Sequence, residues 1–411
     1  MPKQHPSSIP VSVYLLAFGI FAMISCELQV LGMMPLMAQD LGLGIPQVGY
    51  LVSLYAAAMA IGGPLLTLLL GAQPPKRAIY LLYAIFILGE SLGALSDTYG
   101  LLMVSRLVTG AVSGAFFGIA IGICGRLVPP GLAIRAVAIV LAGIMVGTIL
   151  GLPLASLVGE HYGWRASFWL VVVLALLGVL CSALLLPALP ATARIGLAQE
   201  LAVFHNRRLW YVYSTSFCVI GATYAAFSYF VPILTQVAGF AGGSVSLLLF
   251  VYGIAMLIGN HLVAMLAGRR NILLLAVGLV LQILFLALLA LFIHHSWMVI
   301  AAVIGLGLVG VSMNPAMVSR VMQLPHGERP LVNTVHASVI TLGIMFGSFA
   351  SGLVLDQGYS LLSPMWVGVA VALAGLLTLL LEGPGKTAPA DGSSANDRGQ
   401  EVSGPIPPDA R

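Results

Sequence analysis

The chain consists of long apolar runs separated by short polar segments. Most runs reach about 20 residues, the length that an α-helix needs to cross a hydrocarbon core of about 30 Å. The runs are continuous and do not alternate with polar residues over about 10 positions, which excludes an outer-membrane β-barrel. We predict an all-α polytopic membrane protein with twelve transmembrane helices. The predicted spans are about residues 11–37, 47–70, 78–96, 101–124, 134–158, 165–187, 210–236, 244–267, 272–293, 297–319, 331–355 and 362–381.

The composition points to the same class. Of 411 residues, 60% are hydrophobic and 7% are charged, whereas a soluble domain carries about 25% charged residues. The first apolar run is too long for a cleaved signal peptide, and no small-residue cleavage site follows it. The four cysteines fall inside apolar runs without a CxxC or Cys/His cluster, so neither a disulfide nor a metal site is predicted. We attribute the net charge of +4 to membrane topology and not to nucleic-acid binding.

The longest internal connection, residues 188–209, is polar and divides the chain into two parts. We predict an N-terminal six-helix bundle in residues 1–187 and a C-terminal six-helix bundle in residues 210–382, joined by a cytoplasmic linker. Residues 383–411 are rich in Gly, Pro, Ser, Ala and Asp, which predicts a disordered cytoplasmic tail.

Lysine and arginine placement predicts the orientation. With the N-terminus in the cytoplasm, all of the 17 lysines and arginines lie on the cytoplasmic side except Arg165, which lies outside, and Arg106, which lies within a span. Such a bias places positive loops in the cytoplasm. We therefore expect a protein of the cell (inner) membrane with both termini cytoplasmic.

The two halves are related in sequence. Tyr55–Gly62 in span 2 is similar to Tyr252–Gly259 in span 8, at an offset of 197 residues, and the same offset aligns Pro35 with Pro232 and Gln39 with Gln236. A third match joins Gly143-Ile-Met-Val-Gly147 to Gly343-Ile-Met-Phe-Gly347 at an offset of 200. Paired spans run in the same direction, so the halves form a parallel repeat about an axis along the membrane normal.

Four segments carry a resemblance to a known family. They are Glu27–Gly42, Arg106-Leu-Val-Thr-Gly110, the glycine-rich stretch from Gly143 to Pro153, and Phe230–Phe240. Over residues 10–382, the chain resembles a major facilitator superfamily transporter. More narrowly, it resembles the drug:proton antiporter-1 group, which includes arabinose-efflux-permease-like and chloramphenicol-efflux-like proteins. The resemblance implies proton coupling through Arg106 and an antiporter motif in span 5.

Two segments depart from the family pattern. The loop between spans 2 and 3 reads Gly71-Ala-Gln-Pro-Pro-Lys76-Arg77 and lacks the usual aspartate, so no charge latch between helices is expected there. In span 5 the family's adjacent Gly-Pro pair is replaced by Gly151-Leu-Pro153.

Three charged residues lie within spans of the N-terminal half. Counted at 1.5 Å per residue from the outer ends, Glu27 is roughly 15 Å deep, Arg106 roughly 8 Å and Glu90 roughly 9 Å. Intramembrane charges usually face the bundle interior and pair with one another. We hypothesise that Glu27 takes up a proton from outside, loosens its hold on Arg106 or on substrate, and releases the proton inside. The alternatives are a static Glu27–Arg106 salt bridge and, for Glu90, a position close enough to the helix end to reach interfacial water.

Glycines in span 5 recur at every fourth position and form one stripe that permits close helix approach. We expect this stripe, with a bend at Pro153 and a repeat in span 11, to seal the interface between the halves, and ordinary small-residue packing is the alternative. The residues concerned are Gly143, Gly147, Gly151, Pro153, Gly343 and Gly347.

Further polar or aromatic residues within spans are candidates for a substrate cavity. For the tyrosines, aromatic core packing is the alternative, and for the histidines, a satisfied hydrogen bond in the core. The candidates are Gln29, Tyr55, Tyr252, Asn260, His261, Asn314, Asn333 and His336.

The leading interpretation is a proton antiporter that expels a small neutral or amphipathic compound and uses the proton gradient without a cofactor. We expect it to act as a monomer in lipid, without nucleic acid. A proton-coupled importer of a sugar or nucleoside on the same fold is the runner-up, and a non-transporting membrane sensor is a remote alternative. A membrane enzyme is disfavoured, because the sequence has no Walker loop and no HExxH motif.

Overall fold

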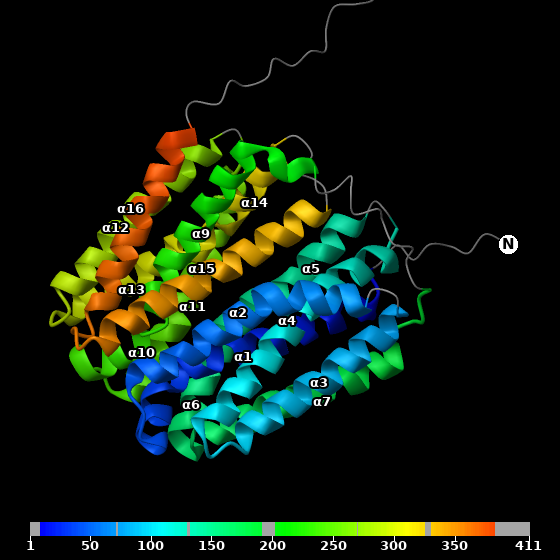
Figure 1. Ribbon diagram of the computed structural model, residues 1–411, viewed down its shortest axis with the longest axis horizontal. Coiled ribbons are helices and arrows are strands. Elements are labelled where there is room, and N and C mark those ends of the chain that lie inside the picture. Colours follow the sequence, from blue (N-terminus) through cyan, green and yellow to red (C-terminus); the bar gives the residue numbers. More distant parts are fainter. Residues whose placement is uncertain are drawn as a thin grey trace, which may run out of the picture.

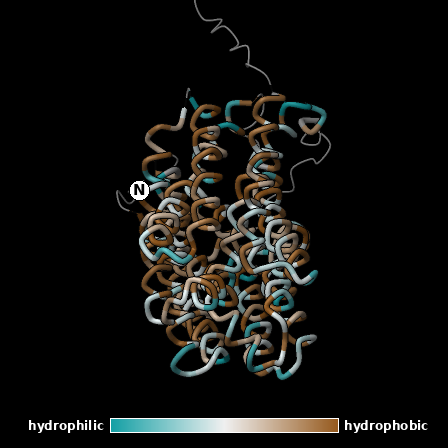
Figure 2. Tube along the Cα trace, turned by 90° about the vertical axis from the view of Figure 1, so that its left-hand side faces the viewer, coloured by the Kyte–Doolittle hydropathy of each residue, from teal (hydrophilic) through white to brown (hydrophobic). Residues whose placement is uncertain are grey.

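The computed structural model describes residues 9–70, 73–129, 132–190, 202–268, 270–324 and 330–382, and these residues form helices and connecting loops. Two helical bundles lie side by side, and the long helices α2 and α15 run along their boundary (Figure 1). Brown, hydrophobic residues fill most of the length of the helices, and hydrophilic ones gather toward their ends and loops (Figure 2). The tail and much of the predicted linker lie outside the described residues.

The N-terminal bundle contains the first six predicted spans. Its helices are α1 (Val11–Leu41), α2 (Ile45–Leu70), α3 (Pro75–Ala94), α4 (Tyr99–Leu127), α5 (Ala133–Val146), the π-helical turn η2 (Gly147–Gly151), α6 (Leu152–Tyr162) and α7 (Trp164–Leu185). Because α5, η2 and α6 follow one another without a break, they form a single span.

The C-terminal bundle contains the other six predicted spans, preceded by the short 3-10 helix η3 (Ala202–His205). Its helices are α9 (Arg207–Phe227), α10 (Phe230–Pro232), η4 (Ile233–Val237), α11 (Gly242–Leu266), α12 (Asn271–Leu291), α13 (Ser296–Val309), η5 (Val311–Met313), α14 (Asn314–Met322), α15 (Pro330–Asp356) and α16 (Ser363–Glu382). Within the described ranges, 11 helices are long and apolar enough to cross a membrane, or 12 if α9 and the segment after its 40° bend count as one span. This confirms the predicted fold class of two six-helix halves.

Three spans depart from a regular α-helix shortly before a proline, and of these the sequence predicted only the bend at Pro153. Proline has no N–H to donate and its ring crowds the carbonyl four residues earlier, which widens or kinks the helix. The π-helical turn lies directly before Pro153, the bend after α9 lies before Pro232, and the 3-10 turn η5 lies before Pro315. The expected bend at Pro153 thus takes the form of a local π turn.

The internal repeat is visible in the packing. An added Cβ at Gly110 in α4 would meet the backbone carbonyl of Tyr55, and one at Gly307 in α13 would meet that of Tyr252. The glycine and the tyrosine of the second contact each lie 197 residues after those of the first. The sequence register between the halves therefore matches equivalent positions in space.

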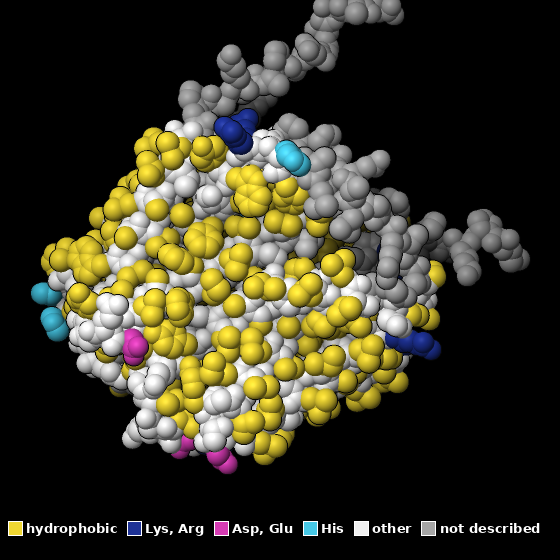
Figure 3. Space-filling view, viewed as in Figure 1, with side chains coloured by type: hydrophobic (Ala, Val, Ile, Leu, Met, Phe, Trp, Pro, Cys, Tyr) yellow, Lys and Arg dark blue, Asp and Glu magenta, His cyan; other side chains and the backbone are white. Residues whose placement is uncertain are grey.

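Charged residues divide the molecule into two ends. Lysine and arginine lie toward one side of the view in Figure 3, and aspartate and glutamate lie toward the opposite side. We call the end with Lys76, Arg126 and Arg207 the arginine-rich end. The opposite, arginine-poor end holds Arg165, whose guanidinium donates to Asp40 at 2.6 Å.

The halves meet along two seams, α2 against α15 and α6 against α11. In the second seam the hydroxyl of Ser246 donates to the hydroxyl of Ser156 at 3.0 Å. In the first, the Ser348 hydroxyl donates to the Gly49 carbonyl at 3.3 Å. Within the C-terminal half, the Ser348 carbonyl in turn accepts from the hydroxyl of Tyr229 at 3.1 Å. These contacts lie in the part of each helix nearer the arginine-poor end.

Candidate functional site

A buried ion pair lies inside the N-terminal bundle, between Arg106 on α4 and Glu90 on α3. Both side chains are 0% exposed. The second carboxylate oxygen of Glu90 accepts from Gln29 Nε2 at 2.9 Å, and the first accepts from Cys26 Sγ at 2.9 Å. Arg106 Nη1 also donates to the Cys26 carbonyl at 3.0 Å. Each charge therefore has a counter-ion and further hydrogen bonds, which is what allows buried charges to persist in an apolar bundle.

Aromatic rings enclose the guanidinium of Arg106. Its Cζ lies 4.9 Å from the ring centre of Phe168 and 5.6 Å from that of Tyr55, distances typical of cation–π contacts. The Tyr55 hydroxyl donates to Ser113 Oγ at 2.8 Å. The predicted cavity residues Gln29 and Tyr55 thus belong to the packed network around the ion pair.

The predicted pairing of Arg106 with Glu27 is wrong, because Arg106 pairs with Glu90. The idea that Glu90 reaches interfacial water is wrong for the same reason. The cause is the helical phase of α1, where Cys26 and Gln29 lie three residues apart on one face and both bond to Glu90. Glu27 is rotated about 100° from Cys26 and so leaves that face.

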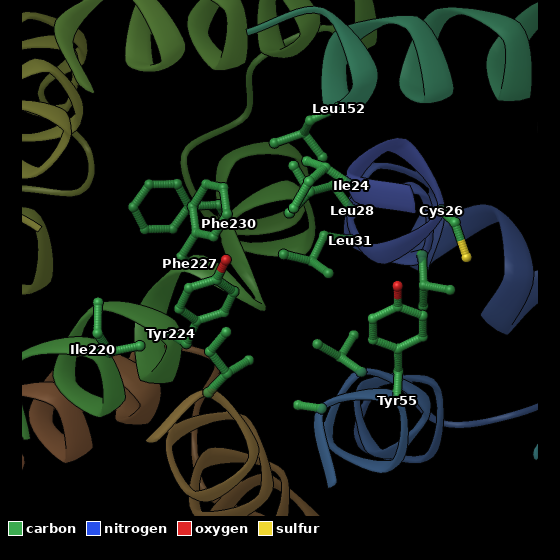
Figure 4. Packing of buried hydrophobic residues seen from close by; sticks show 14 of the residues in the cluster. Ile24, Cys26, Leu28, Leu31, Tyr55, Leu152, Ile220, Tyr224, Phe227 and Phe230 are labelled. Atoms are coloured by element: carbon green, nitrogen blue, oxygen red, sulfur yellow. The ribbon is translucent and has the colours of Figure 1, made fainter. Parts of the chain in front are cut away.

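Glu27 instead faces the C-terminal half. It is 8% exposed, and its carboxylate interacts with the hydroxyl of Tyr224 on α9. The hydroxyl of Tyr224 points toward α1, and the α1 side chains on that side, among them Leu28 and Leu31, are apolar (Figure 4). Among the described residues, Glu27 forms no ion pair.

Tyr224 is held in an aromatic cluster of the C-terminal bundle. Its ring meets Phe227 edge-on at 5.5 Å, and Phe227 stacks on Tyr252 at 4.7 Å. Phe230 lies 5.9 Å from Tyr252. Tyr252 is 1% exposed, and its hydroxyl has no hydrogen-bond partner among the described residues. This arrangement fits aromatic core packing better than the predicted cavity wall.

The predicted cavity residue His336 is also part of a packed contact. Its Nε2 lies 2.9 Å from Ser216 Oγ, and its ring stacks on Tyr213 at 5.6 Å. Both partners are on α9, so His336 joins α15 to α9 within the C-terminal half. This is the satisfied core histidine that the sequence left open as an alternative.

The remaining predicted cavity residues do not lie together with the others. Asn260, Asn314 and Asn333 are half-buried, and His261 is exposed on α11. The side-chain carbonyl oxygens of Asn260 and Asn314 are enclosed and have no hydrogen-bond partner among the described residues. The structure thus distributes the eight predicted cavity residues over several contacts and does not gather them in one cavity.

The glycine stripe of span 5 packs against α1 and does not separate the halves. A Cβ at Gly143 would meet the carbonyl of Ala17, and one at Gly151 would lie 3.0 Å from Ser25 Cα. Gly147 meets Ile24 in the same way. The expectation that these glycines seal the interface between halves is therefore wrong.

The opposite face of span 5 forms the seam with the C-terminal half. There Ile149, within η2, packs on Gly253 of α11, where an added Cβ would lie 2.8 Å from Ile149 Cα. In the other half, Gly343 and Gly347 pack on α9 as the span-5 glycines pack on α1, with added Cβ atoms 2.6 Å from Phe217 O and 2.9 Å from Ala225 N. The two stripes are equivalent features of the repeat.

Sequence reasoning missed Tyr224, although a signal was available. The offset of 197 that aligns Pro35 with Pro232 also aligns Glu27 with Tyr224. Residues at equivalent positions that both face the repeat axis lie opposite each other across it. Within the described ranges, no group of three or more His, Cys, Asp or Glu is arranged to hold a metal ion.

Comparisons with known proteins agree with this architecture. The sequence profile of the Major Facilitator Superfamily matches residues 13–324 and 239–404. The inner membrane transport protein YdhP of Escherichia coli is 31% identical over 372 residues, which cover 89% of this chain and 93% of that protein. The chloramphenicol resistance protein of Streptomyces lividans is 28% identical over 393 residues, covering 93% and 99%. The crystal structure of the nucleoside transporter NupG superposes with a TM-score of 0.72 at 14% identity, over 92% of this chain and all of that one, which shows the shared fold.

Proposed function

The chain belongs to the major facilitator superfamily, and on this premise we propose that it is a proton-coupled secondary transporter that expels a small neutral or amphipathic organic compound. In this proposal the proton gradient drives transport and no cofactor takes part. The carrier resides in the cell (inner) membrane as a monomer, with both termini in the cytoplasm, surrounded by lipid and without nucleic acid.

The observation that carries the proposal is the difference between the two buried acids. Glu90 is neutralised by Arg106 and held by Gln29 and Cys26, so its charge is structural. Glu27 is buried where the halves meet, without an ion pair among the described residues. A charged carboxylate in hydrocarbon costs about 2.5–3.5 kcal/mol on insertion scales, and residues kept at such a cost usually serve ion or proton movement. Glu27 is therefore our candidate for the group that carries the proton.

The conformation supports a transport cycle by alternating access. The halves are joined near the arginine-poor end by the hydrogen bonds Ser246–Ser156 and Ser348–Gly49. By the positive-inside rule this end faces outward. We take the structure as a state closed to the outside, from which a rocking motion of the halves opens the outward path. Apolar residues dominate the surroundings of Glu27, which favours substrates with little charge.

The experiment combines a compound panel with transport in proteoliposomes. Overexpression in an efflux-deficient host identifies compounds whose toxicity the protein lowers, and chloramphenicol, named for one relative, is the first compound of the panel. A compound found in this way is then loaded into proteoliposomes with an imposed pH gradient. We expect its movement to run opposite to that of protons.

Glu27→Gln tests the proton carrier. We expect it to insert normally and to lose pH-driven transport, whereas Asp356→Asn, at an exposed carboxylate of the arginine-poor end, retains it. Unchanged pH-driven transport in Glu27→Gln would remove Glu27 from the coupling mechanism. Accumulation driven by protons moving in the same direction as the compound would show an importer and overturn the efflux proposal.

A further inference from the structure

We infer that Tyr224 is the positioning residue for Glu27, whose ionised carboxylate its hydroxyl holds across the boundary between the halves. Through this link the carrier stays closed at the arginine-poor end until a proton reaches Glu27. The inference rests on the proposed function, because it assigns a partner to the proposed proton carrier.

The first support is the symmetry of the two halves. Glu27 and Tyr224 are separated by the repeat offset of 197. The offset is correct in space, because Gly110 packs on Tyr55 as Gly307 packs on Tyr252. A residue of α1 that faces the pseudo-two-fold axis faces its counterpart on α9 across that axis. The duplicated fold therefore places these two side chains opposite each other, whatever their chemistry.

The second support is that the other polar groups near Glu27 are already engaged. The Tyr55 hydroxyl donates to Ser113 at 2.8 Å, and the Cys26 thiol donates to Glu90 at 2.9 Å. The guanidinium of Arg106 pairs with Glu90. Of the hydroxyl, thiol and guanidinium groups named here, the Tyr224 hydroxyl is the one whose interaction is with Glu27 itself, and we assign it as the donor to the carboxylate.

The third support is that Tyr224 is fixed in place. The side chain is 7% exposed, and its ring packs edge-on against Phe227 at 5.5 Å, which in turn stacks on Tyr252 at 4.7 Å. A rocking motion of the C-terminal half therefore moves the hydroxyl with the whole cluster. The distance between Glu27 and Tyr224 reports directly on the relative position of the halves.

The chemistry makes this link sensitive to protons. A hydrogen bond from a neutral donor to a carboxylate is about twice as strong as one between neutral groups. Protonation of Glu27 therefore weakens the bond and lets the halves separate at the arginine-poor end. When Glu27 is ionised and no cargo is bound, the bond holds the empty carrier closed, which suppresses transport cycles without exchange.

The experiment measures opening of the arginine-poor end as a function of pH. Spin labels at Gly100→Cys and Gln357→Cys, exposed positions of the two halves, report its separation in lipid nanodiscs. In the wild-type background we expect opening as the pH falls. With Tyr224→Phe, the midpoint should move up by about one pH unit, because the ionised form loses a charge-assisted bond.

Three further variants separate this role from a general effect on packing. Tyr252→Phe removes a hydroxyl from the same aromatic cluster and should leave the midpoint unchanged. A fluorinated tyrosine at position 224, whose hydroxyl donates more strongly, should move the midpoint down, and it tests the proposal even if Tyr224→Phe fails to fold. In a Glu27→Gln background, Tyr224→Phe should add no pH-dependent shift.

The outcomes distinguish this inference from the proposed function. A wild-type midpoint in both Tyr224 variants, together with loss of coupling in Glu27→Gln, would overturn the role of Tyr224 and leave the proton carrier intact. An equal shift in Tyr252→Phe would also overturn it, since the effect would then come from the cluster as a whole. If Glu27→Gln retains pH-driven transport, the proposed function fails first.

Discussion

Glu90→Ala is expected to destabilise the N-terminal bundle by about 3–5 kcal/mol, the cost of leaving one partner of a buried ion pair without its counter-ion. In this protein the cost falls on Arg106, whose side chain is 0% exposed. The substitution also removes the acceptors of Gln29 and Cys26, whose donors are left buried. Unsatisfied buried donors add about 1–3 kcal/mol each where the site does not relax.

Part of the charge remains compensated, which sets the upper limit of this effect. Arg106 keeps its bond to the Cys26 carbonyl at 3.0 Å and its contacts with the faces of Phe168 and Tyr55. We therefore expect Glu90→Ala to lower the free energy of unfolding by an amount in the lower half of the range of about 3–5 kcal/mol. Glu90→Gln, which keeps the shape and one acceptor oxygen, should lose less than Glu90→Ala.

Unfolding free energies measured by steric trapping in bicelles test this reasoning. The informative control replaces both partners: Glu90→Leu with Arg106→Met removes both charges together and should be close to neutral, because apolar replacement of a buried pair often is. A loss below about 1 kcal/mol in Glu90→Ala would be the size expected for an exposed pair. That result would refute the assignment of Glu90 and Arg106 as a static, buried ion pair.

Two further predictions concern helix packing. Gly143→Val should prevent correct assembly, because its side chain would meet the carbonyl of Ala17. The control Gly125→Val, with open space at its Cβ, should express and melt like wild type in detergent. Equal expression and melting of the two variants would contradict the packing of α5 on α1. Ser156→Cys combined with Ser246→Cys should form a disulfide under mild oxidation, because the two hydroxyl oxygens lie 3.0 Å apart across the seam. The disulfide should arrest transport, and reduction should restore it. Transport that continues with the crosslink formed would show that this seam does not open.

The spans and their grouping into halves could be predicted because hydropathy and arginine placement act over whole segments. A run of about 20 apolar residues is sufficient to define a span, whatever its neighbours are. The breaks before Pro232 and Pro315 were missed, although proline is visible in the sequence. Proline is tolerated in transmembrane helices when neighbours satisfy the freed carbonyl groups, so its effect depends on packing.

The contacts of the site were harder to predict because depth does not determine the direction of a side chain. Counting residues placed Glu27, Glu90 and Arg106 in one layer, and the layer is consistent with the Arg106–Glu90 pair. The choice of partner depended on the rotation of α1 about its axis, which is set by packing on several helices. The prediction for the span-5 glycines was wrong for a similar reason. A stripe of small residues predicts that another helix packs closely against it, but it does not identify which helix.

The repeat is consistent with the different roles that we propose for the two acids of the N-terminal bundle. Arg106 has Val303 as its counterpart at the offset of 197, so the C-terminal half lacks the cation and its core there is apolar. Glu27 has Tyr224 as its counterpart, a neutral donor in place of a second acid. Under the proposed function, a charge that changes at Glu27 is thus opposed by a partner that does not change, so the strength of their contact follows the protonation of Glu27. Glu90, opposed by a permanent cation, lacks this property, and so the asymmetry between the halves, more than the depth of either acid, makes Glu27 the better candidate for coupling.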